Sequence, residues 1–415
     1  MELNMSDPGH VAWMLTASAL VLLMTPGLAF FYGGLVRGKN VVSTMMYSYV
    51  SMAVVSVIWV LWGYSLAFGS GGDFIGNFDF LGFKDVSSEG EDGGISPMLF
   101  AIFQMMFAII TPALITGAFV ERFKFTTYIV FLFAWVTLVY VPITHWVWAS
   151  DGWIAGLGAL DFAGGIVVHA SAGIAAIVVA RMVGSRRNIE RGVEPHNVPY
   201  VLLGTGLLWF GWFGFNAGSG LLADSTAVSA FLVTNTSAAV AGLVWMILEY
   251  QSTGRTSGVG FATGVIAGLA SITPAAGFVG PMGAFAIGIV GGAAAYTTVK
   301  IMAKMGIDDA LEVFAVHGVG GIWGTIATGI FAVQAMDDDG VLQNVGLVDG
   351  ETALLWANFR AVVAVAIYSG VASFVILKIL DVIPGLGLRV GEGDEDLGLD
   401  ITLHGERGYV ADGAD

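Results

Sequence analysis

The chain has 415 residues, of which 56% are hydrophobic and 12% charged, and its mean hydropathy is +0.81. No soluble core needs so much apolar surface, so the composition predicts an all-α integral membrane protein. The absence of cysteine excludes disulfides, thiolate metal sites and thiol catalysis. The net charge of −16 and the few, scattered basic residues argue against nucleic-acid binding.

Eleven apolar runs are long enough to cross a membrane. We expect them at residues 11–34, 41–69, 97–119, 125–147, 162–182, 198–218, 226–250, 258–273, 280–303, 311–334 and 352–381. Glycine and proline interrupt several of them, which membrane helices tolerate where neighbouring helices satisfy the freed backbone groups. Residues 1–383 should therefore form a transmembrane domain, and residues 384–415 a tail.

The basic residues predict the orientation. Of the 16 Lys and Arg residues, all except Lys84 and Arg360 lie at or after the ends of odd-numbered runs. The positive-inside rule makes that side cytoplasmic, so the N-terminus should lie outside and the C-terminus inside. The excess of acidic residues fits solvated loops and fits an adaptation to high salt equally well.

Two of the apolar runs carry a histidine. In DFAGGIVVHASAG (161–173) and DALEVFAVHGVGG (309–321), Asp161 and Asp309 each precede a histidine, His169 and His317, by the same spacing. Ionisable groups inside a span are costly, and matched ones indicate a site at a repeat interface. Each segment closes a five-span unit, about 11–182 and about 198–334. Because five is odd, the two units should be inverted, with the eleventh helix (about 352–381) outside them.

Other kinds of site fit the two histidines less well. Eight residues of helix rise about 12 Å and turn by about 80°, so an aspartate cannot share an ion with the histidine of its own helix. We therefore expect no metal and no cofactor. A purely structural histidine pair remains an alternative. A potassium or sodium channel would show a carbonyl filter or an acidic ring, and an enzyme a nucleophile or metal cluster. The spans show none of these, so we expect no enzyme.

Five strings resemble the Amt/Mep/Rh family of ammonium transporters, and the likeness extends through essentially the whole chain. They are TPGLAFFYGG (25–34), DFAGGIVVH (161–169), GWFGFNAGS (211–219), HGVGGIWG (317–324) and LHGERGY (403–409). The resemblance implies a homotrimer in the cell membrane, with one pore per subunit for ammonium uptake and methylammonium as an analogue. A neutral gas channel and an ammonium sensor that signals through its tail are the alternatives.

The family's external recruitment site corresponds to Trp148, Phe107 and Ser219, and its stacked phenyl gate to Phe107 and Phe215. A Trp face can attract ammonium by about 0.5 to 2 kcal/mol, and a serine oxygen can accept one of its N–H groups. Potassium has no donors, so hydrogen bonding can discriminate between the ions. Without the resemblance, Trp148 would equally fit an interfacial aromatic belt.

Further residues match the family around this site. Asp161 corresponds to an aspartate that supports the external site and is implicated in deprotonation, although a helix cap is also a sufficient role. For Asp309 we expect only the capping role, and Trp212 should shape the pore beside the histidines. Met105 and Met106 stand where the family often has smaller residues.

The resemblance also predicts regulation from the cytoplasmic side. In the family the tail lies against the cytoplasmic loops and takes part in control by a PII-type signal protein. Three basic residues after the fifth run, Arg186, Arg187 and Arg191, are candidate partners for the tail carboxylates. Exposed pairs of this kind contribute only about 0 to 1 kcal/mol each. A solvated, disordered acidic tail is the alternative.

Overall fold

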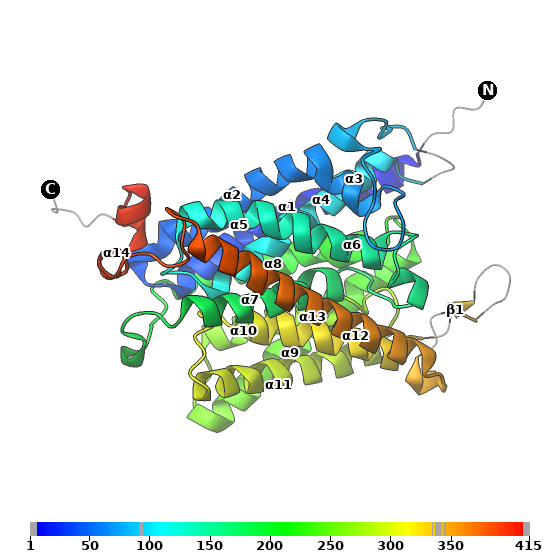
Figure 1. The fold of residues 1–415 in the computed structure, drawn as a ribbon. Coiled ribbons are helices and arrows are strands. Elements are labelled where there is room, and N and C mark those ends of the chain that lie inside the picture. Colours follow the sequence, from blue (N-terminus) through cyan, green and yellow to red (C-terminus); the bar gives the residue numbers. More distant parts are fainter. Residues whose placement is uncertain (1–5, 91–93, 334, 337–341, 344–345, 410–415) are drawn as a thin grey trace.

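A computed structural model of the chain describes residues 6–90, 94–333, 335–336, 342–343 and 346–409. Its long helices lie side by side in one bundle (Figure 1). In the described residues, 10 helices are long and apolar enough to span a membrane, and the shorter apolar helix Gly258–Ile272 lies among them. The eleven predicted runs are thus all helical.

The spans contain the following segments. The first five are α1 (Pro8–Leu35), α2 to α3 (Val41–Ile58, Tyr64–Phe68), α4 (Pro97–Ile115), α5 to α6 (Phe125–Trp135, Val141–Trp148), and η7 with α7 (Gly165–Ala170, Ser171–Val183). The next five are α8 (Val198–Gly218), α9 (Ser225–Thr253), α10 (Gly258–Ile272), α11 (Pro281–Lys304), and η9 with α12 (Phe314–Val319, Gly320–Phe331). The last is α13 (Ala353–Val382), preceded by the short antiparallel pair β1 (Ala335–Met336) and β2 (Leu342–Gln343).

The fifth and tenth spans begin at Gly165 and Phe314, later than the predicted starts at 162 and 311. The reason is the same in both: an aspartate carboxylate, Asp161 or Asp309, accepts the first amide N–H groups and holds a short loop before the helix. Both spans then open with a π-helical segment that contains the histidine. Segments of π-helix are rare in proteins, and those that occur are often found at functional sites.

The packing of the helices repeats between the two halves. Helix α1 contacts α2 and α4, as α8 contacts α9 and α10. Helix α2 contacts α5 as α9 contacts α11, and α4 contacts α7 as α10 contacts α12. The two predicted five-helix units are therefore visible in the structure, and their odd number of spans makes them inverted. Helices α1 and α8, which begin the units, lie along each other.

Glycine lets these two helices approach closely. A Cβ atom at Gly204 of α8 would collide with the backbone of Phe31 and Gly27 in α1. Without a hydrophobic driving force in the bilayer, close backbone contact of this kind supplies the packing energy. Helix α13 lies outside the units and contacts α5, α7 and α12. Its Asn358 is bonded to the backbone of Leu160 in the first unit and of Thr325 in the second, which fastens α13 to both halves of the bundle.

The connections gather at two ends of the bundle. Helix α14 (Glu392–Leu397) lies at the end opposite to β1 (Figure 1). We call the end with α14 the tail end and the other the Trp148 end, since α6 finishes there with Trp148. The basic residues that follow odd-numbered spans therefore gather at the tail end.

The tail end contains a buried cluster of charged side chains. Arg186 donates to both carboxylate oxygens of Asp308, at 2.8 and 3.0 Å, and to Glu121 at 3.2 Å. Arg122 lies 3.8 Å from Asp308 and donates to three backbone carbonyls of the surrounding loops besides that of Asp308. Burial acts to raise the pKa of Asp308, but the hydrogen bond and charge of Arg186 and the charge of Arg122 hold it below its usual value. The cluster fixes three loops to one another.

The tail lies against these loops. Arg187 contacts Glu392 at 2.6 Å and Asp396 at 3.1 Å, and Lys39 donates to the carbonyls of Glu395 and Asp396. The prediction that Arg186 pairs with the tail is wrong, because Asp308 and Glu121 occupy its guanidinium group. The side chain of Arg191 lies outside the described part of the structure. A second anchor is η11 (Asp400–His404), whose Asp400 accepts the amide N–H of Ser43 in α2.

Candidate functional site

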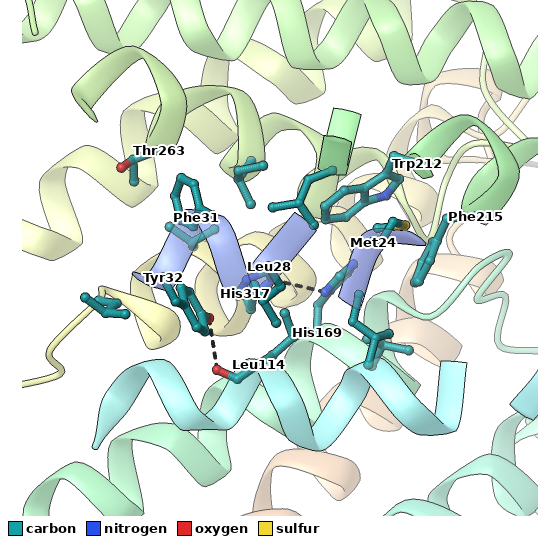
Figure 2. A pocket seen from close by; sticks show the side chains of 16 residues that line it. Met24, Leu28, Phe31, Tyr32, Leu114, His169, Trp212, Phe215, Thr263 and His317 are labelled. Atoms are coloured by element: carbon teal, nitrogen blue, oxygen red, sulfur yellow. Dashed lines mark hydrogen bonds between the residues drawn. The ribbon is translucent and has the colours of Figure 1, made fainter. Parts of the chain in front are cut away.

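A narrow cavity lies between the two repeats (Figure 2). The space open to the centres of water-sized molecules is ≈ 20 Å³, little more than one such molecule occupies. Along it, Phe215 lies at one end, His169 and His317 in the middle, and Tyr32 and Thr263 toward the other (Figure 2). The lining residues are Met24, Leu28, Phe31, Tyr32, Ile110, Leu114, Val168, His169, Leu208, Trp212, Phe215, Thr263, Ile266, Leu311, Val316 and His317.

The two histidines meet in this cavity. The Nδ1 atoms of His169 and His317 are 3.2 Å apart, and the rings are stacked with centroids 5.2 Å apart. Since one Nδ1 must donate and the other accept, the pair shares one proton along this contact when both rings are neutral. Among the described residues, no group bonds Nε2 of His169, although this atom is buried. Buried polar atoms are nearly always paired, so this nitrogen is available to a water or another small polar molecule in the cavity.

Small residues bring the histidines together. A Cβ atom on Gly173, one turn beyond His169, would overlap the backbone of Gly318, the residue after His317. A Cβ atom on Gly321 would likewise collide with the backbone that precedes and follows His169. The glycines that follow each histidine in the sequence therefore permit the contact between the two rings.

A stacked pair of phenyl rings closes the cavity toward the Trp148 end. The centroids of Phe107 and Phe215 are 4.2 Å apart with the planes inclined by 34°, and both side chains are fully buried. Phe215 stacks in turn on His169 at 5.9 Å. Trp212 also stacks on His169, with centroids 5.4 Å apart, and the hydroxyl of Thr273 accepts its indole N–H at 2.9 Å. The stacked rings therefore separate the cavity that holds the histidines from the Trp148 end.

Trp148 lies on the side of this ring pair that faces away from the histidines. Its ring meets Phe107 edge to face at 5.9 Å, and its indole N–H donates to the carbonyl of Asp161 at 2.8 Å. Ser219 caps α8 and donates its hydroxyl to the carbonyl of Phe215 at 2.8 Å, which leaves the oxygen lone pairs able to accept. The structure thus brings Trp148, Phe107, Phe215 and the histidines into one series of touching rings.

Asp161 holds the loop beneath Trp148. One carboxylate oxygen accepts the amide N–H groups of Gly164 and Gly165, at 2.9 and 2.6 Å, and the other those of Ile166 and Val167, at 2.8 and 3.0 Å. Burial raises the pKa of the Asp161 carboxyl, and the four amide hydrogen bonds act in the opposite direction. The geometry is that of a helix cap whose oxygens are both fully engaged.

Two polar residues of the cavity were not found by sequence reasoning. The hydroxyl of Tyr32 donates to the carbonyl of Leu114 at 3.0 Å, and that of Thr263 to Val259 at 3.0 Å. Tyr32 belongs to the string TPGLAFFYGG, but no charge or repeat spacing distinguishes it. In the part of the chain that the structure describes, no group of three His, Asp or Glu side chains could hold a metal ion.

The bundle and this cavity define a multi-pass helical membrane protein with a narrow, histidine-containing cavity at a repeat interface. The chain matches the model of the Ammonium Transporter Family over residues 12–409 and belongs to that family. It is 46% identical over 404 residues to the ammonium transporter of Bacillus subtilis (strain 168), covering 97% of this chain and 98% of that protein.

Solved structures agree with this assignment. The crystal structure of Saccharomyces cerevisiae Mep2 superposes with a TM-score of 0.88 at 36% identity, covering 95% of this chain and 92% of that one. A protein described as a sensor Amt protein superposes with a TM-score of 0.85 at 30% identity, covering 95% of this chain and 98% of that one. The predicted family and the predicted membrane fold are confirmed.

Proposed function

We propose that this chain moves ammonium across the cell membrane by binding it at the outer mouth, removing its proton and passing ammonia through the lumen. The observation that carries the proposal is the contact between His169 and His317 inside a cavity of ≈ 20 Å³. Moving a bare cation from water into an apolar lumen costs several kcal/mol, about the penalty for burying an unpaired charge. Neutral ammonia that is hydrogen-bonded to imidazole avoids most of this cost.

The outer site supplies recognition. The face of Trp148 attracts the cation, and the lone pairs of Ser219 accept an N–H bond. Phe107 and Phe215 then separate the bound cation from the histidines, so ammonium gives its proton to water at the outer mouth and the nitrogen passes the two rings as ammonia. Asp161 acts here as a positioning residue, because its oxygens already accept four amide N–H groups and have little capacity left for the proton of ammonium.

The orientation follows from charge. With the tail end in the cytoplasm, the basic loops obey the positive-inside rule and Trp148 faces outward. The remaining family features are part of the same proposal: a homotrimer, no catalysed reaction, and a cytoplasmic PII-type protein that acts on the docked tail. Transport is favoured over sensing because the identity to the Bacillus transporter exceeds that to the sensor protein.

The test is the current recorded on a solid-supported membrane when reconstituted protein meets an ammonium pulse. A current with ammonium and none with potassium would show that the proton crosses the membrane together with the nitrogen. A neutral gas channel would instead change the internal pH without current. His169→Ala and His317→Ala should abolish or alter selective uptake while the protein still assembles. Methylammonium uptake at the wild-type rate in both variants, with potassium still excluded, would make the pair structural.

A further inference from the structure

The inverted repeat relates Glu312 to Gly164. Each lies three residues after the aspartate that opens its histidine segment, Asp309 and Asp161 respectively. Both have a left-handed backbone, with φ of 64° at Glu312 and 110° at Gly164. Glycine adopts this conformation without strain, but a glutamate does so at a cost. Strain of this kind persists where the surrounding structure enforces it, often at functional sites.

Gly164 lies beside the outer binding site. A Cβ atom placed there would come within 3.5 Å of the Trp148 ring and closer still to Val168. A side chain at this position would therefore disturb the recruiting tryptophan. In the second repeat the equivalent position is at the inner mouth of the lumen, and there it carries a carboxylate.

Glu312 borders two hollows at the tail end, of ≈ 430 and ≈ 230 Å³. The smaller one shares Thr263 and Leu311 with the cavity that contains the histidines, so Glu312 lies where the lumen opens. Within the described residues, the hydrogen bonds of Glu312 are those of its backbone, to Asp309 and Val316. Arg186 also lines both hollows, but Asp308 and Glu121 engage its guanidinium group.

We propose that Glu312 binds ammonium at the inner mouth of the lumen, as the counterpart of Trp148 at the outer mouth. An ionised carboxylate accepts hydrogen bonds from the N–H groups of ammonium and attracts its positive charge. At the outer site these two interactions come from different residues: the Trp148 ring attracts the charge, and the Ser219 hydroxyl accepts an N–H group. The inference rests on the proposed transport function and adds a second cation site to it.

The surroundings suit such a role. Burial, together with the negative charges of Asp309 and Glu249, raises the pKa of the Glu312 carboxyl to about 7. A cation that arrives beside the carboxyl favours its ionised form, so binding of ammonium and ionisation of Glu312 reinforce each other.

The test compares the two faces of the full-length protein. Methylammonium flux is measured in right-side-out and inside-out vesicles for the wild type, Glu312→Gln and Glu190→Gln. Glu190 is an exposed carboxylate that borders the same larger hollow and serves as the matched control. For Glu312→Gln, the half-saturating concentration at the cytoplasmic face should rise about tenfold, as for the loss of one charge-assisted hydrogen bond, with no change at the outer face.

Glu312→Gly is a second variant that tests the proposal if Glu312→Gln does not fold. It restores the residue that the first repeat has at this position and relieves the strained backbone, so it should fold and show the same one-sided loss. Unchanged saturation at the cytoplasmic face in a folded variant, or an equal change at both faces, would overturn the proposal. Absence of methylammonium flux in the wild type would instead refute the proposed function itself.

Discussion

Replacing Asp161 tests whether this residue holds the outer half of the lumen together. Its two oxygens accept four amide N–H groups at 2.6 to 3.0 Å. In Asp161→Asn only one side-chain oxygen remains, and it can accept two of the four. The other two N–H groups would then be buried beside an amide that cannot accept from them.

The expected loss follows from these contacts. A hydrogen bond to a charged group contributes about 1.5 to 3 kcal/mol, so Asp161→Asn should cost about 3 to 6 kcal/mol. Asp161→Ala removes all four bonds and should cost about 6 kcal/mol or more, which is comparable to the whole stability of many proteins. We therefore expect Asp161→Ala not to accumulate as a folded protein.

Thermal unfolding of the purified protein in detergent measures the effect. The matched control is Asp309→Asn in the second repeat, because Asp309 accepts the amide N–H of Phe314 through one oxygen, a bond that asparagine can keep. The control should unfold close to the wild-type temperature, and Asp161→Asn well below it. Equal unfolding temperatures for Asp161→Asn and the wild type would refute the capping argument, and loss of transport in such a folded variant would return Asp161 to a role in deprotonation.

Three further changes have defined outcomes. Trp148→Leu should raise the half-saturating concentration of ammonium at the outer mouth about 2- to 30-fold, and an unchanged value would make Trp148 a membrane-belt residue. Gly173→Val drives a side chain into the backbone of Gly318 and should abolish a monodisperse peak in size-exclusion chromatography, whereas Gly156→Val, which meets no atom, should leave it intact. Truncation after Pro384 should reduce uptake and abolish pull-down of a PII protein, and wild-type values of both would make the tail dispensable.

The sequence by itself determined the membrane spans, their alternating directions and the equal aspartate-to-histidine spacing in two of them. These features are local, because a helix in hydrocarbon must satisfy its own backbone hydrogen bonds and needs a continuous apolar stretch. The equal spacing of Asp161 to His169 and Asp309 to His317 is a property of the sequence. Together with the odd number of spans in each unit, it predicted that the two histidines meet.

Only the tertiary structure decided the partners of individual side chains. Arg186 and Arg187 are neighbours in the sequence, yet one is buried against Asp308 and Glu121 and the other lies against the tail. Likewise, nothing in the string DALEVF indicates that Glu312 borders the mouth of the lumen. The physical reason is that burial and pairing depend on which distant segments pack together, and a charged residue at a helix end has the same local signal whether it faces solvent, a tail or a cavity.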